Sequence, residues 1–343
     1  MQISIIIPTL NRAKLLERTL QSIFNQEPPG IDFEVIIVDN GSSDDTARIC
    51  DTSSPWFTHF QYIYDDVPGQ LTGRHRGLKE SKGELLCYFD DDVILNPRWI
   101  KSIAELSEKY PHVEIFGGPS IPEYEVNPPA WLDHFWENTP YGGKVCLPLS
   151  LIDLQIKEGM VDPLYVFGLN FSIRRETLLR LRGFHPDCVP SKLQMFQGDG
   201  ETGLAIKASM NKIKAFQASA LSVKHQITHD RLTIQYFEKW SFYNGVCQSF
   251  TDLRRNNHLY SLPETDASSQ SGFPYFAKCI LNRVSGKLKI LMSPQLIKEI
   301  TRRIHTSYQN GYKFHQDAFR SDEKVKNWVL KPDFLDYTLP VAS

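Results

Sequence analysis

Short apolar runs alternate with amphipathic segments of helical length through about residue 120 of the chain. The apolar runs are Ile3–Ile7, Phe33–Val38, Gln61–Tyr64, Leu85–Phe89 and Val113–Phe116. Helical segments follow at Arg12–Asn25, from Ser43-Asp44-Asp45, at Leu71–Ser81 and from Pro97 to Tyr110. Strands that alternate with helices favour an α/β fold, in which a parallel sheet is covered on both faces.

The pattern is less regular after this point. Pro122–Pro148 is rich in proline, glycine and aromatic residues, which predicts a long loop that could bind a ligand. A strand is expected at Val166–Arg174, and helices are expected at Glu176–Leu181, Gly200–Ser209 and Arg231–Asn244. Pro263–Gly272 has the composition of a linker, and basic amphipathic helices are expected at Phe276–Ile304 and Glu323–Leu330. We therefore expect an α/β domain over residues 1–250 and a C-terminal helical extension over residues 251–343.

Charge and cysteine content exclude several classes of protein. The 343 residues include 38 Lys and Arg against 40 Asp and Glu, so a bulk attraction to nucleic acid is not expected. The six cysteines form no CxxC pair, which disfavours a zinc ribbon and favours a reducing compartment. The apolar stretch near the N-terminus, Ile3–Leu10, is too short for a transmembrane helix and lacks a basic leader. These features predict a cytoplasmic protein.

Three adjacent carboxylates follow the apolar run Leu85–Phe89: Asp90, Asp91 and Asp92. They repel one another, and a divalent cation would relieve that repulsion, since Mg²⁺ and Mn²⁺ favour carboxylate oxygens. The end of a strand is also where open α/β sheets bind ligands. A solvated acidic turn is the alternative, but the preceding buried strand favours a cation site.

Polar residues also follow the first two apolar runs. Asp39 ends the second run, where its carboxylate could accept hydrogen bonds from a base or a ribose. Ser43 is equally explained as a helix cap. The first run ends at Pro8, and three further polar residues are expected at the same edge: Thr9, Asn11 and Arg12. An ordinary strand-to-helix connection remains the alternative there.

A basic cluster lies in the helical segment Leu71–Ser81. Arg74 and Arg76 flank His75, and guanidinium groups match phosphate oxygens in a bidentate manner. A helix face exposed to solvent would explain the same cluster without a ligand.

Together these four segments resemble the family-2 glycosyltransferases, which have the GT-A fold. The strings IIIPTLNR, VIIVDNGSSDDT, TGRHRGL and YFDDDV occur in the order and spacing of that family, and the resemblance runs from Met1 to about Gly245. It implies a mixed, mostly parallel sheet flanked by helices. It also implies that a nucleotide-sugar donor, a UDP- or GDP-sugar, binds across the strand ends.

The resemblance assigns roles to the residues of these strings. Thr9, Arg12 and Asp39 would hold the nucleoside, and Arg74 would lie near the diphosphate. Asp90 and Asp92 would form the DxD pair, with Asp92 as the more direct ligand of Mn²⁺ or Mg²⁺ and Asp90 nearer the ribose. Pro8, Asn11 and Asp91 complete the expected donor-binding set.

Further matches lie downstream. Gly168 and Asn170 hold the usual positions of the family's acceptor-side strand, in the string VFGLNFSIRRETLLRLRGF. In FQGDGETGLAIKA the usual Glu-Asp pair is replaced by Asp199-Gly200-Glu201, so the catalytic base is either Glu201, which the alignment favours, or Asp199.

The string VKHQITHDRL supplies a metal-binding histidine in the same way, either His225 or His229. A structural histidine is the alternative for both.

The implied reaction is an inverting glycosyl transfer to a carbohydrate or lipid-linked acceptor, as in the synthesis of cell-surface polysaccharides. Glu201 or Asp199 would deprotonate the acceptor hydroxyl. A sugar nucleotidylyltransferase is the rival enzyme, but it would need a glycine-rich loop that PTLNR lacks, and a dehydrogenase is disfavoured by the absence of GxGxxG. The altered Asp199-Gly200-Glu201 segment keeps open a catalytically inactive protein that binds sugar nucleotides.

The C-terminal extension has two interpretations. Lys278, Arg283, Lys287 and Lys289 are interleaved with apolar residues. Such a helix could pack on the catalytic domain, or it could contact the inner face of a membrane as a peripheral anchor.

Overall fold

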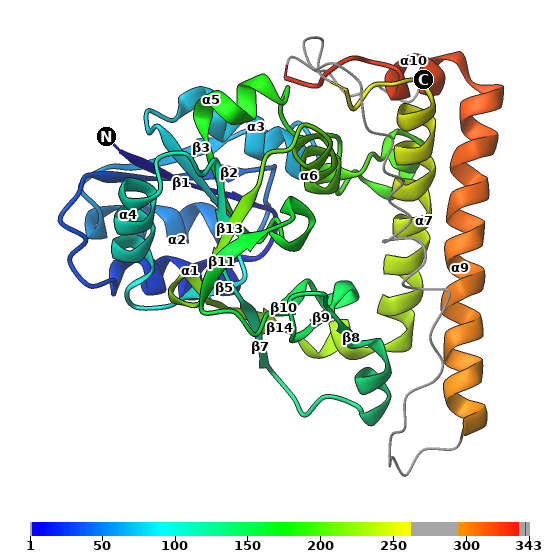
Figure 1. Ribbon diagram of the computed structural model, residues 1–343, viewed down its shortest axis with the longest axis horizontal. Coiled ribbons are helices and arrows are strands. Elements are labelled where there is room, and N and C mark those ends of the chain that lie inside the picture. The colour runs from blue at the N-terminus through cyan, green and yellow to red at the C-terminus, as the bar shows by residue number, and fades with distance from the viewer. Residues whose placement is uncertain (1, 262–293, 336–339, 341–343) are drawn as a thin grey trace.

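The computed structural model describes residues 2–261, 294–335 and 340, and the chain runs from the blue to the red end of Figure 1. The main sheet comprises β1 (Ile3–Thr9), β2 (Phe33–Asp39), β3 (Phe60–Tyr64), β4 (Leu85–Phe89), β6 (Ile115–Gly117), β11 (Glu158–Val161), β12 (Asn170–Arg174) and β13 (Ala215–Ala218). Their order across the sheet is β11-β13-β6-β12-β4-β1-β2-β3.

The strands of this sheet are mixed in direction. β1 pairs in parallel with β2 and β4, β2 with β3, and β13 with β6. β12 lies antiparallel between β4 and β6, so the start of β12 lies beside the end of β4, where Asn170 pairs with Phe89. This arrangement confirms the predicted α/β fold with a mixed, mostly parallel sheet.

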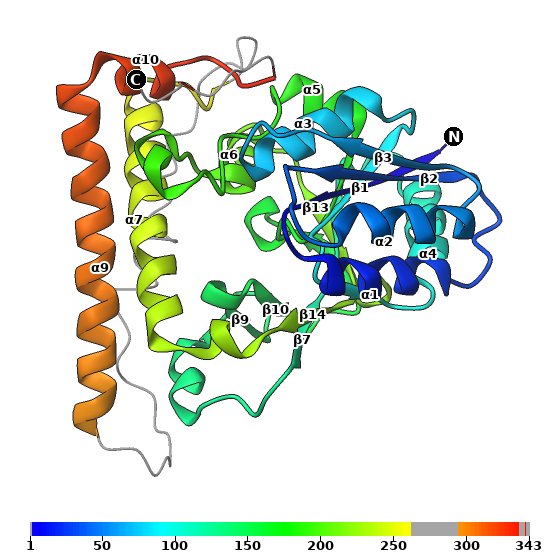
Figure 2. The same cartoon turned by 180° about the vertical axis from the view of Figure 1, so that it is seen from behind.

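Helices cover both faces of the sheet (Figures 1 and 2). One face carries α1 (Ala13–Phe24), α2 (Thr46–Ser53) and α4 (Trp99–Lys109), and the other carries α3 (Gln70–Glu80), α5 (Arg175–Arg180) and α6 (Gly200–Met210). Side chains alternate along a strand, so Ile5 and Ile7 join the core on the α1 side while Ile6 joins the core on the α3 side. Burial on both faces explains why β1 is apolar along most of its length.

A second sheet extends from the first. It contains β5 (Val93–Leu95), β7 (Ser120–Tyr124), β8 (Glu137–Asn138), β9 (Lys144–Cys146), β10 (Leu151–Asp153) and β14 (Val223–Ile227), in the order β5-β14-β7-β10-β9-β8. The expectation of one long loop at Pro122–Pro148 is therefore wrong, because the segment contributes β8, β9 and part of β7, and its Trp131 is buried. Strands of two or three residues are too short to display an alternating pattern.

In the described residues of the C-terminal part, two long helices, α7 (Ile234–Asn256) and α9 (Pro294–Ser321), are followed by a short helix, α10 (Glu323–Val329). α7 and α9 stand side by side in both views (Figures 1 and 2). A Cβ atom at Gly245 would lie 2.1 Å from the carbonyl oxygen of Tyr308, and one at Gly311 would lie 2.0 Å from that of Phe242. The two backbones thus touch where the helices cross, which only glycine allows.

The C-terminal helices confirm the helical appendage, although the expected boundary at residue 250 falls inside α7. The expected linker at Pro263–Gly272 and the four basic positions from Lys278 to Lys289 lie outside the described residues. Within the part of the chain that is described, no helix combines the length and the apolar character needed to cross a membrane.

Candidate active site

The predicted site residues gather where the strands of the main sheet end. Thr9 and Asp39 are paired across β1 and β2, and Asp90 follows directly after β4. Parallel strands bring their carboxyl ends to one edge of a sheet, so this convergence follows from the topology. The three acids after β4 nevertheless lie in different surroundings.

Asp91 points into the protein. Its carboxylate accepts a hydrogen bond from the Thr9 hydroxyl (2.7 Å) and another from Nη1 of Arg12 (2.6 Å). Burial, together with the neighbouring Asp92, raises the pKa of Asp91 to about 6 in spite of Arg12. Asp91 and Thr9 therefore connect the end of β1 to the loop after β4, and their contact with a donor stays a prediction.

Asp92 is the most enclosed of the three acids, with a side chain only 2% exposed. Its Oδ2 atom accepts hydrogen bonds from Nη1 of Arg12 (2.9 Å) and Nη1 of Arg231 (3.0 Å). Its Oδ1 atom lies 3.2 Å from Nε2 of His225 and has no hydrogen-bond partner. Burial opposes the charge, but positively charged neighbours, Arg12 and Arg231 among them, outweigh it and hold the pKa of Asp92 well below its ordinary value.

His225 is held in one tautomer. Its Nδ1 atom lies 2.9 Å from the carbonyl oxygen of Leu149, which can only accept, so Nδ1 carries the hydrogen. Nε2 is then left with a lone pair, to which Nη1 of Arg231 donates over 2.8 Å. His229, the alternative, lies on the surface beside Glu125 with its side chain 72% exposed. The structure therefore places His225, and not His229, next to Asp92.

Asp92 and His225 are suited to a divalent cation. Each directs a lone-pair atom into the same buried space, and His225 donates its other ring nitrogen to a backbone carbonyl, as metal-binding histidines do. Among the described residues, no three His, Cys, Asp or Glu side chains converge tightly enough to complete a site. The remaining ligands would come from water and from the phosphates of a substrate, as is usual for Mg²⁺.

Asp90 lies at the open side of the site, with its side chain 28% exposed. Gln70, at the start of α3, donates a hydrogen bond from Nε2 to its Oδ1 atom (2.7 Å). Arg74 lies one turn further along α3, with Nη2 3.7 Å from the same oxygen and Nη1 3.0 Å from Oε2 of Glu201. Arg74 thus joins Asp90 to Glu201, whereas Arg76 points to the surface and pairs with Glu80.

Arg74 is itself buried and packs over the ring of Phe184 at 5.1 Å. Burial opposes its charge, but Glu201, Asp90 and Asp187 together raise the pKa of Arg74 above its ordinary value. Gly168 makes room for this pair, since a Cβ atom there would lie 2.6 Å from Nη2 of Arg74 and 2.7 Å from Cδ of Glu201. Asn170, the other expected acceptor-side residue, is buried and donates to the carbonyl oxygen of Leu221.

Glu201 and Asp199 differ sharply. Glu201 lies in the first turn of α6 with its side chain 29% exposed, while the side chain of Asp199 is 1% exposed. Asp199 accepts hydrogen bonds from Thr251 (2.6 Å) and from Tyr260, and it lies 2.5 Å from Nδ1 of His185. Burial opposes ionisation of Asp199, but His185 and these hydroxyl groups lower its pKa. Of the two predicted bases, only Glu201 is therefore exposed to solvent, and the choice between them stays a prediction.

Three other residues singled out in the sequence, Pro8, Asn11 and Ser43, make contacts within the protein at the ends of the strands. Pro8 packs against α3, so that a Cβ atom at Gly73 would lie 2.7 Å from it. Asn11 adopts a positive φ of 54°, and its Oδ1 atom accepts from the backbone of Ser43 (2.8 Å). Ser43 therefore does not cap α2, whose N-cap residue is Asp45.

Asp39 is buried and already engaged. The backbone nitrogen of Ser42 donates to its Oδ1 atom, and the hydroxyl of Tyr62 donates to its Oδ2 atom, both over 2.8 Å. A carboxylate offers about four lone-pair positions, so Asp39 retains the capacity to accept a hydrogen bond from a ligand.

Three residues of the site escaped prediction: Gln70, Asp187 and Arg231. Asp187 accepts from Nε2 of Gln197 (2.7 Å), and burial together with Glu201 raises its pKa to about 6. Arg231 lies within the string VKHQITHDRL, but no spacing rule links it to Asp92. Gln70 and Asp187 carry no sequence signal at all.

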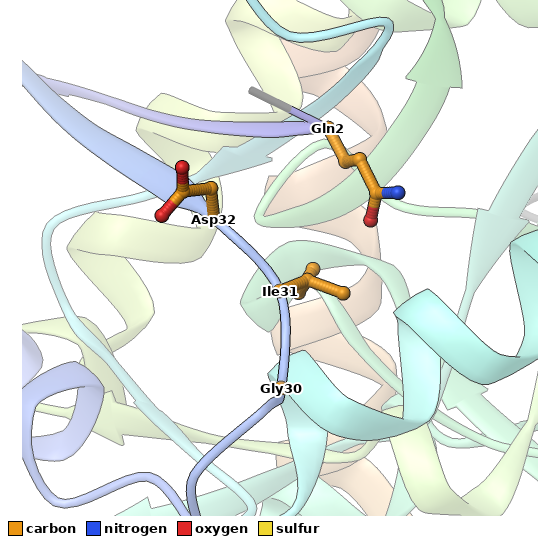
Figure 3. Close-up of a pocket in the computed structure, with 4 residues that line it drawn as sticks. All are labelled: Gln2, Gly30, Ile31 and Asp32. Carbon is orange, nitrogen blue, oxygen red and sulfur yellow. The ribbon is translucent and has the colours of Figure 1, made fainter.

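The pocket in Figure 3 lies elsewhere. It is lined by Gln2, Gly30, Ile31 and Asp32, which precede β1 and β2. These residues are at the opposite ends of the strands from Asp39 and Asp90. Open α/β sheets bind ligands at the carboxyl ends, so we do not assign the donor to this pocket.

Comparisons with known proteins find similar sequences among glycosyltransferases. The validoxylamine A glucosyltransferase of Streptomyces hygroscopicus subsp. jinggangensis is 26% identical over 200 residues, which cover 54% of this chain and 47% of that protein. The GalNAc(5)-diNAcBac-PP-undecaprenol beta-1,3-glucosyltransferase of Campylobacter jejuni is 31% identical over 115 residues, which cover 33% of this chain and 37% of that protein. The chain thus spans about a third to a half of the length of the curated relatives it matches.

A solved structure has the same fold. The mannosyltransferase PcManGT from Pyrobaculum calidifontis, in complex with GDP-Man and Mn²⁺, matches with a TM-score of 0.50 and 16% identity, over 93% of this chain and 74% of that chain. The family model described as glycosyl transferase family 2 matches residues 4–161, which hold β1, β2, β4 and the three acids. Through these residues the chain is similar to glycosyl transferase family 2, and its fold is the GT-A fold.

Proposed function

We propose that this protein is a metal-dependent, inverting glycosyltransferase that moves a sugar from a nucleotide-diphosphate donor to a hydroxyl acceptor. One observation carries the proposal: Arg74 joins an open carboxylate on α6, Glu201, to the carboxylate Asp90 at the end of β4. A base for the acceptor and a cation for the leaving group therefore lie side by side at the strand ends.

Glu201 is the proposed base. It would take the proton from the acceptor hydroxyl, so that the oxygen forms a bond to the anomeric carbon. The bond from that carbon to the diphosphate breaks on the opposite face, and the nucleoside diphosphate leaves with the bonding electrons. Because Glu201 already pairs with Arg74, which is buried, the arginine holds the carboxylate in place and can also face the departing phosphate.

The donor would lie along the same edge. Asp39 retains acceptor capacity for the nucleoside, and Arg12 reaches from α1 towards Asp91 and Asp92. Asp92 and His225 would hold Mn²⁺ or Mg²⁺, with Asp90 close to the donor. When bound, such an ion supplies positive charge to the diphosphate as it leaves.

The nature of the substrates follows from the relatives by analogy. The PcManGT structure contains GDP-Man, and the Campylobacter jejuni relative acts on an undecaprenol-linked sugar. We therefore propose a UDP- or GDP-sugar as the donor and a carbohydrate or lipid-linked acceptor. We also propose a cytoplasmic location, in which a lipid-linked acceptor would bring the protein to the inner face of a membrane.

The Glu201→Gln variant tests the assignment. We expect it to bind UDP-glucose, UDP-GlcNAc or GDP-mannose as the native protein does, but to turn over the accepted donor at least about 100-fold more slowly, because a general base typically contributes this much. Turnover is measured as nucleoside diphosphate release in the presence of Mn²⁺, and donor binding is measured by calorimetry.

Glu176→Gln is the matched control, because Glu176 is an exposed glutamate in the first turn of another short helix, α5. It should turn over normally. Near-native turnover by the Glu201→Gln variant would refute Glu201 as the base. Donor binding without turnover by the native protein would instead favour a catalytically inactive protein.

A further inference from the structure

Arg231 occupies an unusual position beside the proposed metal ligands. It belongs to the short 3-10 turn His229–Leu232, between β14 and α7, and its side chain is only 13% exposed. A single atom, Nη1, lies 3.0 Å from Oδ2 of Asp92 and 2.8 Å from Nε2 of His225. Arg231 therefore contacts both proposed metal ligands at once.

The second of these contacts distinguishes Arg231 from Arg12. Arg12 also donates to Oδ2 of Asp92, over 2.9 Å, but its other partner is Asp91. Arg231 alone of the two donates to Nε2 of His225, using the lone pair that a metal ion would need. The two arginines thus supply equal charge at nearly equal distance from Asp92, but only one occupies a ligand position on the histidine.

We propose that Arg231 is an internal cation that competes with the divalent metal for Asp92 and His225, so that the metal binds only when the Arg231 guanidinium has moved away. The proposal rests on the metal use proposed above. A buried carboxylate such as Asp92 is costly without a positive partner, and the guanidinium supplies that partner whenever the ion is absent.

Tyr236 gives the displaced side chain a place to remain. Its hydroxyl lies 3.2 Å from Nε of Arg231, and the guanidinium carbon lies 5.4 Å from the centre of its ring. The hydroxyl also donates to the carbonyl oxygen of Pro148, which fixes the ring. Because the guanidinium is rigid and planar, Nη1 leaves His225 only when the whole group turns, and the contact between Nε and Tyr236 is the point about which it would turn. Because Tyr236 belongs to the first turn of α7, the exchange takes place beside the start of that helix.

Competition of this kind has a measurable consequence. If the metal binds only the fraction of molecules in which Arg231 is displaced, the apparent affinity for the metal is reduced by that fraction. The Arg231→Gln variant lacks the competing cation, so we expect it to bind Mn²⁺ about tenfold more tightly than the native protein in the absence of nucleotide. Free Mn²⁺ is measured by electron paramagnetic resonance, which needs no enzymatic turnover.

The Arg12→Gln variant is the matched control. It removes the same charge from Oδ2 of Asp92 but leaves the contact between Arg231 and His225 intact. We expect its affinity for Mn²⁺ to change much less than that of Arg231→Gln. Arg231→Lys serves if Arg231→Gln does not fold: it keeps the charge but loses the planar fork, and it should also bind Mn²⁺ more tightly. As a second measurement, Mn²⁺ should raise the Tm of Arg231→Gln more than that of the native protein.

Three results would overturn the competition: equal Mn²⁺ affinity in the native and Arg231→Gln proteins, weaker binding by Arg231→Gln, or equal tightening in Arg12→Gln. The first two mean that Arg231 does not oppose the metal, and the third means that charge alone is responsible. If none of these proteins binds Mn²⁺ with or without UDP, the metal use under "Proposed function" fails as well. The two failures are therefore distinguishable.

Discussion

Two acid–arginine clusters share one edge of the sheet and differ in their access to solvent. The inner cluster, Asp91, Asp92, Arg12, His225 and Arg231, holds its two acids almost fully buried. The outer cluster, Asp90, Arg74, Asp187 and Glu201, leaves Asp90 and Glu201 28% and 29% exposed. Buried acids can hold an ion or connect two loops, whereas a general base must be reached by its substrate. The difference in exposure therefore separates binding from proton transfer.

Substitution of Asp92 should produce the largest effect. Asp92→Asn leaves Arg231 and part of Arg12 without their counter-charge, which typically costs about 3–5 kcal/mol in the free energy of unfolding. We expect the lower half of that range, because Arg12 is partly exposed. Urea denaturation, monitored by circular dichroism, measures the change.

Asp90→Asn is the control from the outer cluster. Because Asp90 is more exposed, its loss should cost less than about 1 kcal/mol. Equal destabilisation by the two variants would show that exposure does not separate the clusters.

A methyl group at Gly168 should have the next largest effect. Gly168→Ala places a Cβ atom against both Arg74 and Glu201, and such overpacking costs about 1–3 kcal/mol. The added methyl group should also displace Arg74 and Glu201 from each other, so turnover should fall more than donor affinity. Steady-state kinetics measures turnover, and calorimetry measures donor affinity.

Gly159→Ala is the matched control for crowding. A Cβ atom there would meet only Ile156, at 4.0 Å. Native turnover in Gly168→Ala would contradict the close approach of Arg74 and Glu201.

The smallest effect concerns Asp187. Burial and Glu201 raise the pKa of Asp187 to about 6, so the folded protein binds the proton of this carboxyl group more tightly than the unfolded chain does. The contribution of Asp187 to stability is therefore present below the ordinary pKa of aspartate and is lost as pH rises towards 6. Asp187→Asn mimics the protonated acid at every pH.

The difference in Tm between the Asp187→Asn variant and the native protein should consequently be more positive at pH 7 than at pH 4, by a few degrees at most. Differential scanning calorimetry at the two pH values measures this difference. A difference in Tm that is the same at both pH values would mean that Asp187 is not perturbed.

The sequence predicted the elements whose signal is local. β1, β2 and β4 are continuous apolar runs with acids or polar loops at their ends, so both their positions and the edge that carries Asp39, Asp90 and Asp92 could be predicted. The assignment of Glu201 to the first turn of α6 also needed only local spacing and a family resemblance.

What escaped prediction depends on contacts between distant segments. Arg231 and Asp92 are 139 residues apart, and Gln70 meets Asp90 only because α3 packs beside β1. The strands β8 and β9 are too short to show an alternating pattern of apolar residues. They are stabilised by pairing, β8 with β9 and β9 with β10. The burial of Asp199 depends on Tyr260 and Thr251, which come from the C-terminal helical part.

One helix links the inner cluster to the residue that precedes α6. Near its start, α7 carries Tyr236, which steadies Arg231, and fifteen residues later it carries Thr251, which binds the carboxylate just before α6. That separation is about 22 Å along a helix. The close contact between α7 and α9 at Gly245 and Gly311 lies between these two residues of α7. A displacement of α7 along its axis would therefore shift a partner of Arg231 and a partner of Asp199, two residues before Glu201, at the same time.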